Sequence, residues 1–397
     1  MNRLKRLAAI LLSPTEDLEQ AHAALEAAGV PVSFADCRNC PNPCEDGKQT
    51  HSSIPLGALN RVFAGHEEYP QKIASMIDTT SDMLGSVKPY RRQVVISTGK
   101  SDWGRSVTDE KDSLASYISA IEKASAPLVI SPGGTSAPGT PPGTPGTPVT
   151  PTTPQQQLLL PPAVAGIFKD SENHAVAILN GSHDTLSKSN DHETVLVFPD
   201  YKVLTEVPRS LDGARELWRN SVNPSVPRLG YASTETGTSV RSWVIPYTCV
   251  ILICSHRRRD VRCAVVAPKL EHAFSQTLQA EGWDVHTQLE DPTGSPLEDY
   301  PEGDEKEAEF SRRLQELDEG LPKRALVLKT SHIGGHKYAG NVIIYMPQGA
   351  GVWYGRVSTH EVASIVHTTI LGGRILPPLL RGGVNLARPD CKRLNDW

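Results

Sequence analysis

The sequence predicts an α/β protein that contains two domains. Short apolar runs typical of β-strands alternate with helix-prone segments, and a length of 397 residues suits two domains of ordinary size. A stretch rich in Ser, Thr, Gly and Pro, which follows a short helix-prone segment, indicates a linker between them. We expect an N-terminal α/β domain at residues 1–212, a linker at 213–240 and a C-terminal domain at 241–397.

The first residues favour a β-α-β unit. Residues 1–12 suit a strand, although this basic stretch, with no acid before Glu16, would also suit a mitochondrial presequence. A capping box with proline at the first helical position starts a helix at 17–28, and a second strand is expected at 30–37. Because a cleaved leader would hardly be built into such a unit, we favour the strand. Regular structure is also expected at 93–97, 111–124, 163–179 and 194–199, so the domain could be a degenerate thioredoxin-like fold.

Composition limits the remaining possibilities. Residues 131–162 consist of Pro- and Thr-rich repeats and a glutamine run, which predicts a disordered insert that leaves the domain from a surface loop. A net charge of −5 gives no reason to expect nucleic acid or an anionic membrane as a partner. No apolar run approaches the roughly 20 residues that a membrane span requires. Seven cysteines in a long chain favour a reducing compartment and metal ligation over a disulfide framework.

The C-terminal domain has a recognisable order of elements. A strand at 243–253 is followed by a helix at 269–281 and a strand at 283–288. An acidic segment at 290–319 is expected to be a solvated surface insertion. A strand, a hairpin and a final helix follow at 325–328, 341–357 and 361–370. The order β-α-β-insert-β-β-β-α approximates a thioredoxin-like fold.

Four candidate metal ligands follow two of these strands. Cys254 and Cys263 flank the stretch SHRRRDVR, and His332 and His336 flank IGG. Two thiolates with two imidazoles suit either zinc or a [2Fe–2S] cluster of mixed ligation. Eight intervening residues are many for a zinc finger, whose paired cysteines are usually two to four residues apart.

The residues around the four ligands also fit a cluster. Gly334 and Gly335 would let backbone N–H groups approach sulfide closely, where a Cβ atom would collide. The cysteine segment carries four arginines, of which Arg259 and Arg262 are the candidates to favour a reduced cluster or to dock an acidic partner. The alternative for the arginines is an ordinary solvated loop. His256 could tune the cluster or titrate with it, although an exposed loop histidine is the commoner case.

Four stretches resemble the bis-histidinyl [2Fe–2S] proteins of the sucrase/ferredoxin-like family: ICSHRRRDVRCAVVAPKL, HIGGHKYAGNVIIY, GVWYGRV and CKRLNDW. The resemblance implies a thioredoxin-like ferredoxin domain whose cluster is held by Cys254, Cys263, His332 and His336. Both histidines would bind one iron and both cysteines the other. Imidazole ligation would raise the reduction potential and link it to protonation. Sequence singles out no pair of carboxylates for glycoside hydrolysis.

The favoured function is therefore a proton-coupled electron carrier or redox sensor, rather than an enzyme that converts a substrate. It would need a redox partner, either a reductase or an electron acceptor. Trp397 ends a tail resembling the one that cytosolic Fe–S proteins offer to the late assembly machinery, which favours a cytoplasmic location over a mitochondrial one.

Two alternatives stay open. Zinc at the same four ligands would give an interaction scaffold whose proline-rich insert recruits groove-binding domains. Alternatively, the C-x2-C-x3-C motif of Cys37, Cys40 and Cys44 could bind a metal or support a thiol-dependent oxidoreductase. Cys249 is expected to be a buried packing residue, and the segment from Arg381 to Gly383 is too short for a phosphate loop.

Overall fold

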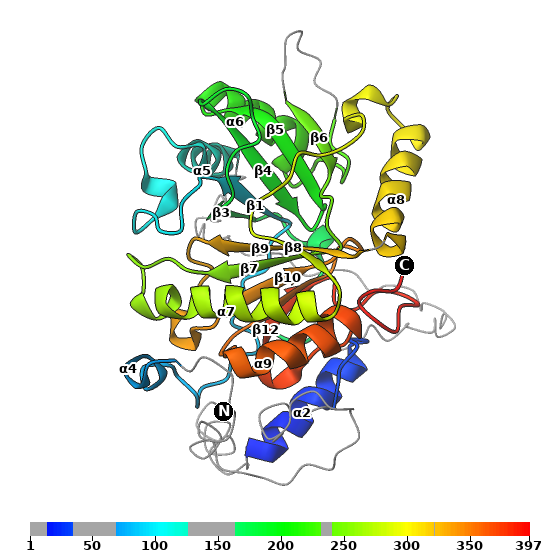
Figure 1. The fold of residues 1–397 in the computed structure, drawn as a ribbon. Helices are drawn as coiled ribbons and strands as arrows, with labels where there is room; N and C mark the ends of the chain where they lie inside the picture. Colours follow the sequence, from blue (N-terminus) through cyan, green and yellow to red (C-terminus); the bar gives the residue numbers. More distant parts are fainter. Residues whose placement is uncertain (1–13, 35–68, 126–162, 232–239, 321) are drawn as a thin grey trace, which may run out of the picture.

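The computed structural model describes residues 14–34, 69–125, 163–231, 240–320 and 322–397. Three predicted features lie outside these residues: the first strand at 1–12, the insert at 131–162 and the thiols of Cys37, Cys40 and Cys44. The mixed α/β class is confirmed, because a 12-stranded mixed sheet carries helices on its faces (Figure 1). The predicted strand at 30–37 is wrong where it can be followed, since Val32 makes only an isolated bridge to Ile375.

The N-terminal half contains one parallel and two antiparallel strand pairings. Strand β1 (Arg92–Ser97) pairs in parallel with β3 (Val176–Gly181), and helix α5 (Leu114–Ser125) lies between them in sequence. Strand β4 (His192–Phe198) runs antiparallel to β1. Strand β5 (Lys202–Pro208), which sequence analysis missed, runs antiparallel to β4 and precedes helix α6 (Leu211–Leu217). The resulting strand order is β3-β1-β4-β5.

The C-terminal half repeats this arrangement. Strand β7 (Cys249–Cys254) leads through helix α7 (Val261–Ala280) to β9 (Arg324–Thr330), which pairs with β7 in parallel. Strands β10 (Val342–Tyr345) and β11 (Gly351–Tyr354) form the predicted hairpin, and β10 is antiparallel to β7. Helix α9 (Thr359–Ser364) follows. The order β9-β7-β10-β11 agrees with the thioredoxin-like order of elements predicted from the sequence.

Two element boundaries differ from the prediction. The strand expected at 243–253 is two strands, because the chain turns at Pro246 between β6 (Arg241–Val244) and β7. Strand β6 pairs with β5 of the N-terminal half. Helix α7 begins at Val261 rather than at 269, since Asp260 caps it and Pro268 is accommodated inside it. Cys263 therefore lies in the first turn of a helix, not in a loop.

The two parallel strand pairs, β1–β3 and β7–β9, meet at one bridge. Strands β3 and β9 are antiparallel and pair only at Gly181 and Thr330, close to the carboxyl end of each strand. Because β1 is parallel to β3 and β7 is parallel to β9, the carboxyl ends of both parallel pairs meet at this junction. The division into domains at 213–240 stays a prediction, but strands of both halves belong to one sheet.

Edge strands and helices complete the sheet. Strand β12 (Leu380–Val384) adds to β11 and pairs with β2 (Ile167–Phe168), while β8 (Asp284–His286) pairs with β9. Helices α2 (Pro14–Ala27), α7 and α9 pack on one face of the C-terminal half. Helix α8 (Asp304–Glu319) buries Phe310 and Leu314 in a second cluster, so the acidic segment is not wholly solvated. Helices α5 and α6 cover the N-terminal half.

Candidate metal centre

The two cysteines lie together under the start of helix α7. Cys254 is the last residue of β7 and Cys263 is the third residue of α7, and their exposures are only 2% and 1%. The six residues between strand and helix form a turn that ends at Asp260, whose carboxylate accepts a hydrogen bond from the backbone N–H of Arg262 (2.9 Å). This turn brings the two thiols into hydrogen-bond contact.

The two histidines follow the neighbouring parallel strand. The chain leaves β9 at Thr330, and Gly334 and Gly335 adopt positive φ angles of +80° and +64° between His332 and His336. The two imidazole rings lie with their centroids 5.4 Å apart. His332 contacts the Cys254 sulfur, whereas His336 is more exposed at the rim.

One imidazole nitrogen at the site has no partner in the described part of the chain. The Nδ1 atom of His332 is buried and has no hydrogen-bond partner among the described residues, which leaves it free to act as a ligand. Across the described residues, no three His, Cys, Asp or Glu side chains converge as a ligand group around one ion.

The thiol pair is electrostatically prepared to lose one proton. A hydrogen bond from Cys263 lowers the pKa of Cys254 well below its usual range, and contacts with His332 and the Ile333 N–H act in the same direction. The pKa of Cys263 is raised, because its proton is held by the Cys254 thiolate and a second charge would be buried beside the first. One thiolate is therefore favoured before any metal binds.

Arg381 on β12 is a site residue that sequence analysis missed. Its side chain is buried, and its guanidinium donates hydrogen bonds to Asn341 Oδ1 (2.7 Å) and the carbonyl of Gly334 (3.2 Å). Burial lowers the pKa of Arg381 to about 10, while the nearby sulfurs of Cys254 and Cys263 oppose this shift. A buried cation beside the two thiols is the electrostatic complement of a thiolate site.

Gly335 makes room for this arginine. A Cβ atom built on Gly335 would lie 2.6 Å from the guanidinium carbon of Arg381. The predicted close approach of backbone N–H groups to sulfide stays a prediction, and the group that Gly335 admits in this structure is a side chain. The signal available in the sequence was an arginine followed by two glycines in an otherwise apolar strand.

Comparison with known proteins identifies a family. The family model described as Sucrase/ferredoxin-like matches residues 83–382, which include the four candidate ligands and Arg381. The chain belongs to the sucrase/ferredoxin-like family.

Curated relatives of this sucrase/ferredoxin-like chain are fungal. It is 35% identical over 136 residues to altered inheritance of mitochondria protein 32 of Meyerozyma guilliermondii, a match that covers 34% of this chain and 35% of the relative. It is 30% identical over 122 residues to actin patches distal protein 1 of Saccharomyces cerevisiae, covering 30% and 29% respectively. These matches span about a third of each relative's length. No solved structure matches.

The arginines predicted around the site have a different role in this family member. Arg262 forms a two-pronged ion pair with Asp260 (2.8 Å) and donates to the carbonyl of Met76 (2.6 Å). Arg259 is exposed and donates to the carbonyl of Arg105 (3.2 Å). Both side chains therefore tie the cysteine turn to the N-terminal half. Arg381, whose charge interacts with both sulfurs, forms no ion pair with a carboxylate among the described residues.

The prediction that His256 would be exposed is wrong. This side chain is only 1% exposed, and its Nε2–H donates to the carbonyl of Trp103 (3.0 Å). Its Nδ1 accepts a hydrogen bond from the backbone N–H of His332 (3.2 Å). Both bonds form together only in the neutral ring that carries its proton on Nε2. His256 therefore positions the backbone of a candidate ligand.

Two further cysteines, Cys249 and Cys391, belong to the described part of the chain. Cys249 is buried on β7, as predicted, and burial raises its pKa to about 12. Cys391 is partly exposed in the C-terminal segment. That segment is held to the fold, since Arg388 donates to the carbonyls of Leu394 and Asp396 (2.7 Å each). Trp397 remains 50% exposed.

Proposed function

We propose that this protein is an electron-transfer or redox-sensing protein that holds one [2Fe–2S] cluster through Cys254, Cys263, His332 and His336. One observation carries the proposal: a thiol pair and an imidazole pair follow two adjacent parallel strands, with His332 against the Cys254 sulfur. When bound, such a cluster would accept and release single electrons.

The surrounding residues support this chemistry. The hydrogen bond between Cys254 and Cys263 favours the first thiolate, and the partnerless Nδ1 of His332 is available as a donor. Arg381 supplies a buried positive charge that stabilises added negative charge. Neutral imidazoles in place of two thiolates reduce the negative charge of the site, which raises the reduction potential.

The decisive experiment is a visible absorption spectrum of freshly purified protein, with iron, zinc and acid-labile sulfide assayed on the same sample. The proposal expects a red-brown protein with about two irons and two sulfides. Cys263→Ser should lose most of this iron, whereas the control Cys391→Ser should retain it. A colourless protein with one zinc and no sulfide would reject the cluster and favour the zinc-stapled scaffold.

Partners and location belong to the same proposal. We infer a redox partner of reductase or acceptor type and a cytoplasmic location, with the mitochondrial alternative kept because several relatives are named for mitochondria.

Half-exposed Trp397 is the proposed contact for the Fe–S assembly machinery. Trp397→Ala should then lower the iron content of protein made in cells, yet leave reconstitution with iron and sulfide in vitro unchanged. Equal iron content in cells would contradict this role. No helix in the described part of the chain has the length and apolar character to span a bilayer.

A further inference from the structure

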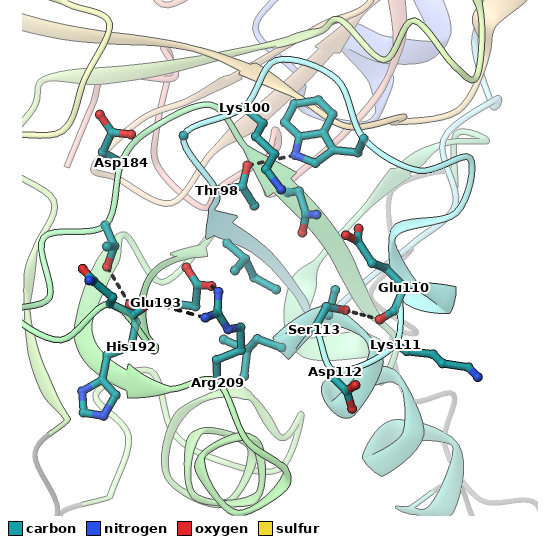
Figure 2. Close-up of a pocket in the computed structure, with 18 residues that line it drawn as sticks. Thr98, Lys100, Glu110, Lys111, Asp112, Ser113, Asp184, His192, Glu193 and Arg209 are labelled. Atoms are coloured by element: carbon teal, nitrogen blue, oxygen red, sulfur yellow. Dashed lines mark hydrogen bonds and ion pairs between the residues drawn. The ribbon is translucent and has the colours of Figure 1, made fainter.

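A second site candidate lies in the N-terminal half. A cleft of about 400 Å³ opens at the carboxyl ends of β1 and β3, beside the start of α5 (Figure 2). In the repeated strand arrangement, β1 and β3 correspond to β7 and β9. The cleft therefore occupies the position that the candidate metal centre occupies in the other half. Ligands of α/β proteins bind preferentially at such strand ends.

Asn180 gives the cleft an unsatisfied polar group. Its side chain lines the cleft, the residue is only 4% exposed, and the amide makes no hydrogen bond with any described residue. Its backbone N–H and carbonyl are both bonded to Ser331 (3.0 and 2.8 Å), so the backbone at this position is held in place. The side-chain amide lines the cleft and is available to pair with a bound polar group.

The charges around the cleft are mixed. Lys100 and Glu110 both line the cleft, as labelled in Figure 2, and neither forms an ion pair with another described residue. Arg209 is already paired with Glu193 (3.3 Å). The first turn of α5, a helix of 12 residues, adds a partial positive charge beside Ser113. The lining also contains Lys111, Asp112 and Asp184, so cations and acids are both present. Lys100 and the helix start suit a carboxylate, whereas Glu110 and the other acids suit an amino group and disfavour a polyanion.

We propose that this cleft binds a small zwitterion of the amino-acid or short-peptide class. Its carboxylate would lie near Lys100 and the start of α5, its amino group near Glu110, and a polar group against the Asn180 amide. This size class matches the cleft volume, which is at the small end for ligand pockets.

Two hydrogen-bonded connections link this cleft to the candidate metal centre. Thr98 at the cleft accepts a bond from the Trp103 indole (2.9 Å), and Trp103 in turn accepts from His256, which holds His332. Asn180 is bonded directly to Ser331, the residue before His332. The two sites thus share one framework, but binding in the cleft does not require a cluster.

The test is ligand-observed NMR on the full chain with the twenty free amino acids and with Ala-X-Ala tripeptides. ADP and pyrophosphate serve as anionic comparators. We expect at least one zwitterion to bind. Calorimetry should show its Kd raised about tenfold or more by Asn180→Ala and by Lys100→Glu. The control Lys123→Ala, an exposed lysine at the far end of α5, should leave the Kd unchanged.

Three results would overturn the proposal: no zwitterion binds, both cleft variants bind as tightly as the native chain, or only ADP or pyrophosphate binds. If circular dichroism shows that Asn180→Ala fails to fold, Lys100→Glu decides, because that side chain is exposed. The readout is ligand binding rather than iron or colour. A failure here therefore leaves the proposed cluster untouched, and absence of a cluster leaves this test valid.

Discussion

Arg381 carries a buried positive charge, and few hydrogen-bond acceptors surround its guanidinium. Its guanidinium lies between the rings of Tyr338 and Trp353, 5.8 Å from each centroid, and donates to Asn341 and Gly334. Within the described residues no carboxylate pairs with it. Its charge is therefore available to the two thiols, at a cost that the surrounding hydrogen bonds offset.

Replacing Arg381 with Met should lower the free energy of unfolding by roughly 2–4 kcal/mol, because two buried acceptors lose their donor. Urea denaturation followed by circular dichroism measures this loss. The control Arg312→Met removes only exposed ion pairs with Glu309 and Glu316, and should cost under about 1 kcal/mol. Equal losses in the two variants would show that Arg381 is not a structural cation.

The effect of a side chain at Gly335 can be compared with its effect at Gly282. Gly335→Ala and Gly282→Ala place a methyl group at similar positive φ angles of +64° and +79°. Only the first methyl collides with Arg381, and Gly282 has open space around it. We expect about 1 kcal/mol of backbone strain in both and a further loss of similar size in Gly335→Ala alone. Urea denaturation of the pair tests this, and equal midpoints would contradict it.

His183 provides a pH dependence that is independent of the metal centre. Burial lowers the pKa of this fully buried side chain to about 4, and the Thr194 backbone opposes this only in part. Below about pH 6.5 the unfolded chain binds a proton that the folded chain does not. Stability should therefore fall with decreasing pH, by about 2 kcal/mol between pH 8 and pH 5 from this residue.

The variant His183→Gln should lose that part of the pH dependence, as measured by urea unfolding at pH 8 and pH 5. His174→Gln, which changes an exposed histidine, should keep the native dependence. An unaltered slope in His183→Gln would mean that carboxylates alone account for the acid sensitivity.

At the scale of elements, the start of α7 decides where Cys263 lies. Asp260 adopts extended backbone angles, and its carboxylate caps the helix, so the helix begins directly after it. The partial positive charge of the first turn then falls beside the thiols, which favours a thiolate. The neighbouring element, β9, ends at the same edge of the sheet because it is parallel to β7.

Asp260→Ala should cost about 1–2 kcal/mol of stability, since it removes both the cap and the ion pair with Arg262. Asp260→Asn keeps an oxygen that can cap and should recover most of this loss. Urea denaturation distinguishes the two. If Asn is as damaging as Ala, the carboxylate charge matters more than the cap.

At the scale of the whole molecule, the cysteine turn depends on the N-terminal half. Ser255 donates to the carbonyl of Ser101 (2.9 Å), and the backbone N–H of Arg258 donates to Asp102 (3.0 Å). On the other side of the site, Arg381 donates to Ser86 (3.1 Å). The family match, residues 83–382, includes every residue that forms these hydrogen bonds.

We therefore predict that the fragment 241–397 does not fold as the full chain does, because β6 would lose its partner β5 and these hydrogen bonds would be lost. Its urea unfolding should be less cooperative and it should bind the dye ANS, whereas the full chain should not. A fragment that unfolds cooperatively and holds the same iron as the full chain would establish an independent C-terminal domain.

The sequence by itself determined the local features of this protein. Apolar runs located β1, β4, β7 and β9 because a buried strand requires consecutive apolar side chains. The two ligand pairs were visible because each pair lies within ten residues along the chain. Short-range spacing also indicated that glycine was needed between the histidines.

Only the tertiary structure decided what surrounds these residues. Arg381 reaches Asn341 and Gly334 across the sheet, and His256 reaches back 153 residues to Trp103. Asn180 meets Ser331 across a separation of 151 residues because β3 and β9 join the two halves. No local pattern encodes such pairings. They follow from which strand edges meet, and that depends on the burial of the whole sheet.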